Sequence, residues 1–147
     1  VNPAERFKTL VWMYGADLRW QINPYWAVTA EGYYGNALGS YAAGNKQTFN
    51  RDTGAGVRAS GGFVELECKF TPQWIAHTGF MIDDPLNKDV PIDGRTYQQN
   101  AYGNLMYVRN RYLQVGVELA HLWAGFQGTA REDNQAWVFQ NKMLFTF

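Results

Sequence analysis

The final stretch of the chain, WVFQNKMLFTF (residues 137–147), decides how the rest of the sequence is interpreted. Every second residue from Trp137 to Phe147 is apolar, with the single exception of Asn141. Successive side chains of a β-strand point to opposite faces of a sheet. The stretch therefore predicts a strand with one apolar face that stays regular to the last residue, whereas most chains end in a frayed polar tail.

The same alternation occurs in six earlier segments, and helical periodicity is nearly absent from the chain. The clearest case is residues 61–70, where the apolar residues Val64 and Leu66 alternate with Glu65 and Glu67. The other five segments are residues 9–20, 26–35, 74–82, 101–108 and 112–123. We expect an all-β fold of about seven antiparallel strands.

The connections between these segments alternate in length. Three are short turns, at residues 21–25, 71–73 and 108–111. Three are longer polar loops, at residues 36–55, 83–99 and 125–135. An up-and-down order places all the short turns at one end of the sheet and all the long loops at the other. Outer-membrane β-barrels sort their connections in this way, with short periplasmic turns and long extracellular loops.

Composition limits the alternatives. The 147 residues suit one domain, spanning residues 1–147, and the formal net charge of zero gives no reason to expect a nucleic-acid partner. No run of apolar residues is long enough for a transmembrane helix, and the mean hydropathy is −0.38. A membrane-spanning strand needs only about 9–11 residues with one apolar face, so its hydropathy averages out.

The ending resembles that of Gram-negative outer-membrane β-barrels of porin type, which typically finish with an alternating strand and a terminal Phe. The resemblance implies that the assembly machinery of that membrane reads Phe139, Met143, Phe145 and Phe147. It also implies passive diffusion of small hydrophilic solutes or ions, no enzymatic activity and no cofactor. Such barrels are often trimers, and a subunit contact would shield Asn141 and Gly103 on the lipid-facing side.

Two sets of site residues follow from the barrel interpretation. In a transmembrane barrel the polar face lines a wet lumen, and Trp, Tyr and Phe gather at the membrane interfaces. The candidate pore-lining residues are Asp17, Arg19, Glu31, Glu65, Glu67, Lys69, Glu118 and Lys142. The candidate aromatic girdle consists of Trp20, Trp26, Trp74, Tyr112, Phe145 and Phe147.

The beginning of the chain carries a separate expectation. The start VNPAERFKTL has neither an initiator Met nor a signal peptide. With Phe147 on the periplasmic side, seven strands place Val1 on the extracellular side, whereas bacterial barrels usually have an even number of strands and two periplasmic termini. We therefore expect the chain to be the C-terminal section of a larger barrel.

Other functions remain open. A structural or adhesive barrel would bind partners through its long loops, and a ligand-binding β-barrel in water would place its apolar face inward. An enzyme would need a nucleophile near His77 or His121, and no Ser lies within two residues of either. A weak candidate Ca²⁺ site comprises Asp83, Asp84, Asp89 and Asp93. Cys68, the only cysteine, is interpreted as a small hydrophobic residue.

Overall fold

The computed structural model of the chain describes residues 8–41, 44–128 and 132–145. Seven β-strands account for most of these residues. Their bounds are β1 (Trp12–Gln21), β2 (Trp26–Asn36), β3 (Arg58–Lys69), β4 (Trp74–Pro85), β5 (Arg95–Asn110), β6 (Leu113–Phe126) and β7 (Asn134–Phe145). Three short 3₁₀ helices lie in the connections: η1 (Leu38–Tyr41), η2 (Gly44–Lys46) and η3 (Asn87–Asp89).

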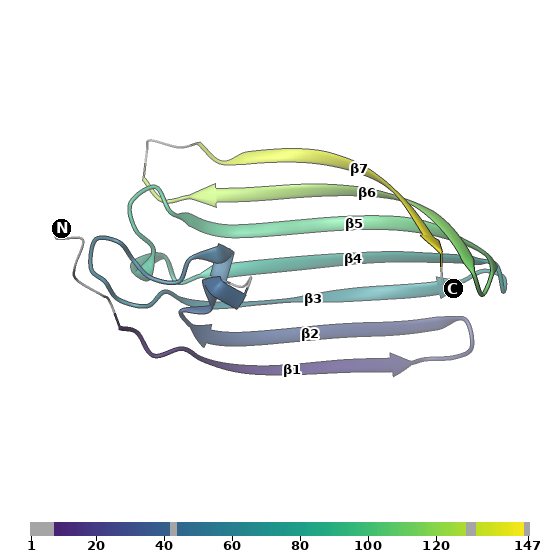
Figure 1. The fold of residues 1–147 in the computed structure, drawn as a ribbon, viewed down its shortest axis with the longest axis horizontal. Coiled ribbons are helices and arrows are strands. Elements are labelled where there is room, and N and C mark those ends of the chain that lie inside the picture. Colours follow the sequence, from purple (N-terminus) through teal and green to yellow (C-terminus); the bar gives the residue numbers. More distant parts are fainter. Residues whose placement is uncertain (1–7, 42–43, 129–131, 146–147) are drawn as a thin grey trace.

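The strands form one antiparallel sheet in which the spatial order follows the sequence, from β1 to β7 (Figure 1). Each strand pairs with the strand that follows it in the chain. The prediction of seven antiparallel strands is confirmed. Within the described residues β1 and β7 form the two edges and do not pair with each other, so the sheet is open rather than closed.

The connections are sorted by length, as predicted (Figure 1). Turns 22–25, 70–73 and 111–112 lie at one end of the sheet, here named the short-turn end. The described residues of the loops 37–57, 86–94 and 127–133, which leave out 42–43 and 129–131, lie at the other end, the long-loop end.

The predicted loop 83–99 is wrong in its bounds, because β4 continues to Pro85 and β5 begins at Arg95. Asp83 pairs with Gln98 in the sheet. Polar residues occur in these strands because they lie on the polar side of the sheet.

The register divides the strands into two faces. Asp17 lies opposite Glu31, Glu67 opposite His77, and Glu118 opposite Gln140. Because side chains alternate along each strand, these residues share one side of the sheet, named here the polar face. The intervening residues form the apolar face, which includes Trp20, Val64, Phe80, Val117 and Phe139.

Buried apolar side chains lie mainly near the long-loop end. Leu38, Val57 and Val90 are almost fully buried where the loops 37–57 and 86–94 pack together. Large side chains on the apolar face are exposed instead. Among the described residues, no helix has the length and apolarity needed to cross a bilayer. The long loops thus form a small packed unit at one end of an otherwise uncovered sheet.

Candidate functional site

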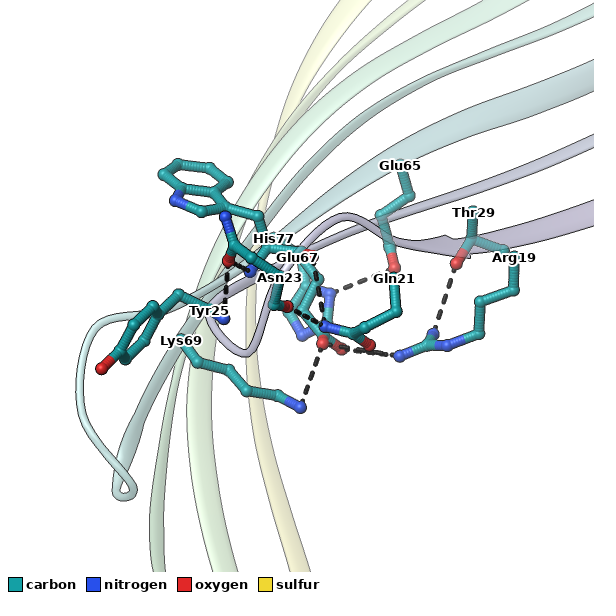
Figure 2. A network of polar contacts seen from close by, with 10 residues as sticks. Arg19, Gln21, Asn23, Tyr25, Thr29, Glu65, Glu67, Lys69 and His77 are labelled. Carbon is teal, nitrogen blue, oxygen red and sulfur yellow. Dashed lines mark hydrogen bonds and ion pairs between the residues drawn. The ribbon is translucent and has the colours of Figure 1, made fainter.

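The polar face carries a network of charged side chains at the short-turn end (Figure 2). The Arg19 guanidinium lies 3.5 Å from the Glu67 carboxylate, and Lys69 Nζ lies 3.4 Å from the same group. Arg19 Nη1 also donates to Thr29 Oγ1 over 3.3 Å. These contacts join β1, β2 and β3, so three of the predicted pore-lining residues form one cross-strand cluster.

The turn between β1 and β2 is fixed by local bonds at the same end (Figure 2). Asn23 Oδ1 accepts from the backbone N–H groups of Tyr25 and Trp26, at 2.8 and 2.9 Å. Gln21 Nε2 donates to the Trp26 carbonyl oxygen over 3.1 Å. Asn favours such a turn because its short side chain bonds to backbone N–H groups two or three residues ahead. The turn therefore holds Trp26 in position at the edge of the apolar face.

A second group links β3, β4 and β5 in the middle of the polar face. Glu65 accepts a hydrogen bond of 2.5 Å from the Tyr102 hydroxyl, and His77 Nδ1 lies 3.1 Å from its other oxygen. Asn104 Nδ2 donates to Glu118 over 3.3 Å on the neighbouring strands. Tyr102 was missed in the sequence because only charged residues were considered, although it occupies a polar row position.

Two predicted pore-lining carboxylates, Asp17 and Glu31, stand directly opposite each other on β1 and β2. Both residues are exposed, and neither forms an ion pair with any described residue. Like charges placed directly across a strand pair repel each other. This pair therefore carries negative charge that no described ion pair balances, whereas Glu67 is paired with Arg19 and Lys69. Lys142, on the edge strand β7, is likewise exposed and makes no ion pair within the described part of the chain.

The loop 37–57 is anchored across the polar face near the long-loop end. Asp83 on β4 accepts from the Tyr33 hydroxyl at 2.6 Å and from the Asn45 backbone N–H at 2.5 Å. The Asn45 side chain donates to the Asp83 carbonyl oxygen over 3.2 Å. Helix η2 consequently packs against β3, β4 and β5 (Figure 1). Sequence reasoning missed this anchor, because nothing in the loop indicates which strand residue it meets.

A second anchor joins the loop 86–94 to β3. The Arg58 guanidinium contacts Asp89 through two bonds, Nε to Oδ2 at 2.6 Å and Nη2 to Oδ1 at 2.9 Å. The hydrogen bond from Arg58 lowers the pKa of the Asp89 carboxyl below its ordinary value. Asn50 Nδ2 donates to the Asp89 carbonyl oxygen over 3.2 Å, which ties the two long loops together.

The four aspartates of the weak Ca²⁺ candidate are not brought together. Asp83 holds the loop 37–57, Asp89 is paired with Arg58, and Asp84 lies on the opposite face of β4 from Asp83. Asp93 lies beyond η3 in the loop 86–94. In residues 8–41, 44–128 and 132–145 no three His, Cys, Asp or Glu side chains are grouped as metal ligands. The spacing of these four aspartates in the sequence therefore does not correspond to a shared metal site in the described structure.

The predicted girdle residues lie at the short-turn end and are exposed. Trp20, Trp26, Trp74 and Phe145 point from the apolar face, and Tyr112 lies in the turn between β5 and β6. Phe147 lies outside the described residues. The Trp74 and Tyr107 rings contact each other with centroids 4.9 Å apart. The girdle interpretation stays a prediction.

A second aromatic band, which the sequence analysis did not identify, lies towards the long-loop end of the same face. The Trp12 ring contacts Tyr34, with centroids 5.4 Å apart. On the same face near the opposite edge of the sheet, His121 stacks on Trp137 with centroids 4.2 Å apart and contacts Trp123 edge-on. Each of these residues belongs to an apolar row of the sequence, but only the aromatics beside the short turns were considered. His121 and Glu118 lie on opposite faces, as their spacing predicts.

The predicted assembly residues Phe139, Met143 and Phe145 form the exposed apolar row of β7. Asn141 lies in the same row, within a shallow apolar hollow that Trp74 and Leu105 also line. Cys68 lies on the apolar face but is buried and makes no disulfide with a described residue. The reading of Phe139, Met143, Phe145 and Phe147 by assembly machinery stays a prediction.

Comparison with known proteins finds no matching family model, no matching curated protein and no matching solved structure. The functional assignment therefore depends on the chemistry of the two faces and of the loops.

Proposed function

We propose that this chain forms part of the wall of a porin-type β-barrel in the outer membrane of a Gram-negative bacterium, through which small hydrophilic solutes or ions diffuse passively. The observation that carries the proposal is the burial of the two faces. On the central strands β3 and β4, Val64 and Phe80 are 48% and 40% exposed on the apolar face. The side chains of Glu67 and His77 on the polar face are only 14% and 17% exposed. A sheet built for water hides its apolar face, whereas lipid favours this arrangement.

The spacing of the aromatic bands supports a bilayer as the solvent of the apolar face. Trp12 begins β1 and Trp20 lies one residue before its end, while Trp137 lies three residues inside the start of β7 and Phe145 ends it. Each pair is separated by eight residues, which is about 26 Å of strand at a rise of ~3.3 Å per residue. A tilt of about 40° reduces the distance across the membrane to roughly 20 Å, close to the ~25 Å apolar band of such barrels.

The polar face has the properties expected of a lumen wall. Carboxylates outnumber basic side chains on the polar face of the described strands. The carboxylates are those of Asp17, Glu31, Glu65, Glu67, Asp83 and Glu118, and the basic side chains are those of Arg19, Lys69, Arg95 and Lys142. Paired groups such as Glu67 and Arg19 strengthen the wall, while Asp17 and Glu31 face solvent. An excess of fixed negative charge concentrates cations in a narrow aqueous pore.

The proposed partners follow from the same faces. Lipid would cover the apolar face, and the assembly machinery of the outer membrane would read the β7 row that ends at Phe147. A trimer contact would cover the region around Asn141 and Gly103, which share the apolar face. Among the described residues, a Cβ at Gly103 would meet only the His77 carbonyl oxygen, at 3.9 Å, and without a side chain at this position a neighbouring subunit could approach the backbone closely.

One observation favours an alternative function. The loop 37–57 lies across the polar face and is held there by Asp83. If this loop and its neighbours closed the lumen, the protein would be a structural or adhesive barrel whose extracellular loops bind partners. Conductance measurements distinguish the two functions, because a barrel whose lumen is plugged conducts no ions.

The test is reconstitution of the intact barrel that contains this chain, purified from its native membrane, into planar lipid bilayers bathed in potassium chloride. Stepwise, ohmic current increments support the pore, and a heat-denatured sample of the same preparation serves as the control. Complete absence of steps, from protein that still co-floats with vesicles, would reject passive diffusion and favour the structural or adhesive barrel. Protein that stays monodisperse without detergent and does not co-float would reject the membrane assignment itself.

A further inference from the structure

A pocket of about 550 Å³ opens between the long loops, bounded by the loop 37–57, the loop 86–94 and the start of β5. It is separate from the charged network of the short-turn end. Its volume falls in the range of small-molecule sites, roughly 300–1,000 Å³. This loop-end pocket combines buried polar atoms, charges of both signs and two aromatic rings, and each of these features restricts what it can bind.

Two buried polar atoms of the pocket lack a hydrogen-bond partner among the described residues. They are Asn45 Oδ1, an acceptor, and Arg95 Nε, a donor. Asn45 is 7% exposed, and its amide cannot be flipped without loss, because Nδ2 already donates to the Asp83 carbonyl oxygen. Arg95 is held by Nη1, which donates to Gln98 over 2.7 Å. Buried polar groups are normally satisfied, so a ligand with both an acceptor and a donor fits this pair of atoms.

The charged side chains of the pocket favour a ligand that carries both a positive and a negative charge. Lys46, Arg51 and Arg95 supply positive charge, and Asp52 and Asp93 supply negative charge. Within the described part of the chain none of these five side chains belongs to an ion pair. Guanidinium groups match carboxylates in shape and charge, and a carboxylate beside an amide oxygen accepts from an ammonium group. A purely anionic or purely cationic ligand would leave one set unused.

Apolar surface completes the pocket. Phe49 and Phe126 both line it, and the Arg95 guanidinium carbon lies 5.8 Å from the centre of the Phe126 ring. A cation over an aromatic face is held in place by the ring quadrupole. The backbone at Asn45, Lys46 and Asp93 is left-handed, with φ of 52°, 62° and 64°. Such conformations cost energy in residues other than Gly and concentrate at binding sites.

We propose that the loop-end pocket binds a zwitterionic solute of about the size of a dipeptide. The carboxylate of the solute pairs with Arg95 and Lys46, its ammonium group donates to Asn45 Oδ1 and Asp93, and its apolar side chains lie on Phe49 and Phe126. The inference rests on the proposed transport function, of which it names the solute class. The pocket would hold the solute at the entrance to the polar face.

The first test measures binding of three matched probes to the purified full chain in detergent by calorimetry or ligand-observed NMR. The probes are leucyl-leucine, its N-acetyl form, which lacks the ammonium group, and its C-terminal amide, which lacks the carboxylate. We expect each modified probe to bind about tenfold more weakly than the free dipeptide, because each loses one charge-assisted contact. Binding of either modified probe as tight as that of the dipeptide overturns the proposal, and so does the absence of binding by all three.

Variants assign the two charges to their partners. In the double variant Arg95→Gln and Lys46→Gln the dipeptide and its amide should bind equally, because both partners of the carboxylate are gone. In Asp93→Asn the dipeptide and its N-acetyl form should converge, and Asn tolerates the left-handed backbone at this position. The control is Arg111→Gln at the short-turn end, which should leave all three affinities unchanged. Probe preferences that persist in both pocket variants overturn the assignment.

Measuring both conductance and dipeptide binding on the same protein distinguishes this inference from the proposed function. Stepwise potassium chloride conductance without dipeptide binding rejects the zwitterion site and leaves the pore. Dipeptide binding without any conductance rejects the pore, and with it the role of the pocket in transport, while the binding site itself stands.

Discussion

An arginine introduced at position 117 tests most directly whether lipid covers the apolar face. Val117 on β6 pairs with Asn141, which lies four residues from Trp137 and four from Phe145. Four residues span about 13 Å of strand, or roughly 10 Å across a membrane at a tilt of about 40°. Val117 is therefore midway between the aromatic bands, and its side chain is exposed on the apolar face.

The expected cost follows from this depth. Arg at the midplane of a lipid-facing strand destabilises a barrel by about 2–4 kcal/mol, and the cost falls to about 0–1 kcal/mol near an interface. Val117→Arg should therefore lower the free energy of unfolding by about 3 kcal/mol. Leu113→Arg should cost less than about 1 kcal/mol, because Leu113 pairs with Phe145 at the short-turn end. If water covered this face, both changes would stay within about 0.5 kcal/mol.

The assay is reversible unfolding by guanidinium of protein folded into phosphatidylcholine vesicles, followed by tryptophan fluorescence. Gln140→Arg is the matched control, because Gln140 lies on the polar face opposite Glu118 and the new charge gains a carboxylate neighbour. Its stability should stay within about 0.5 kcal/mol of the parent protein. The reasoning is refuted if Val117→Arg costs no more than Gln140→Arg, or if Leu113→Arg costs as much as Val117→Arg.

Three further predictions concern the polar face and the loops. Asp83→Asn should weaken the anchor of the loop 37–57 by about 1.5–3 kcal/mol. The expected results are faster protease cleavage of the loop and a larger single-channel conductance. Unchanged cleavage would count against the anchor. Arg58 lowers the pKa of Asp89, so their pair stabilises the fold fully above about pH 4 and loses this effect as the pH falls further. Asp89→Asn should accordingly lower the melting temperature more at pH 7 than at pH 2, and an equal effect at both values would contradict the linkage. Asp17→Asn combined with Glu31→Gln should reduce the preference for cations over anions by roughly a factor of two to three. The measurement is the reversal potential in a potassium chloride gradient. An unchanged potential would contradict the prediction that both residues line the lumen.

The sequence predicted the strands better than the loops. Residues 61–70 and 74–82 alternate so regularly that their faces could be assigned without coordinates, and β3 and β4 confirm both faces. The predicted loop 83–99 is too long, because polar residues such as Asp83 and Gln98 are typical of loops although here they pair in the sheet. Polarity alone cannot distinguish a loop from a strand whose face is polar.

The candidate site could be predicted only as a set of positions. Alternation placed Glu65, Glu67 and His77 on one face, but register decided that Glu65 meets Tyr102 and His77 while Glu67 meets Arg19. Register depends on turn geometry and cross-strand packing over the whole sheet. The second aromatic band was missed for a related reason, since Trp12 and Tyr34 come together only when β1 and β2 pair.

Sequence by itself determined the strand order, the separation of the two faces and the sorting of the loops, because a period of two and the length of a connection are local properties of the chain. Tertiary structure alone decided that Asp83 holds the loop 37–57 over the polar face, that Arg58 pairs with Asp89, and that a pocket forms between the long loops. These contacts join residues 31 to 38 positions apart. Their partners are chosen by the geometry of the folded sheet, which no local pattern specifies.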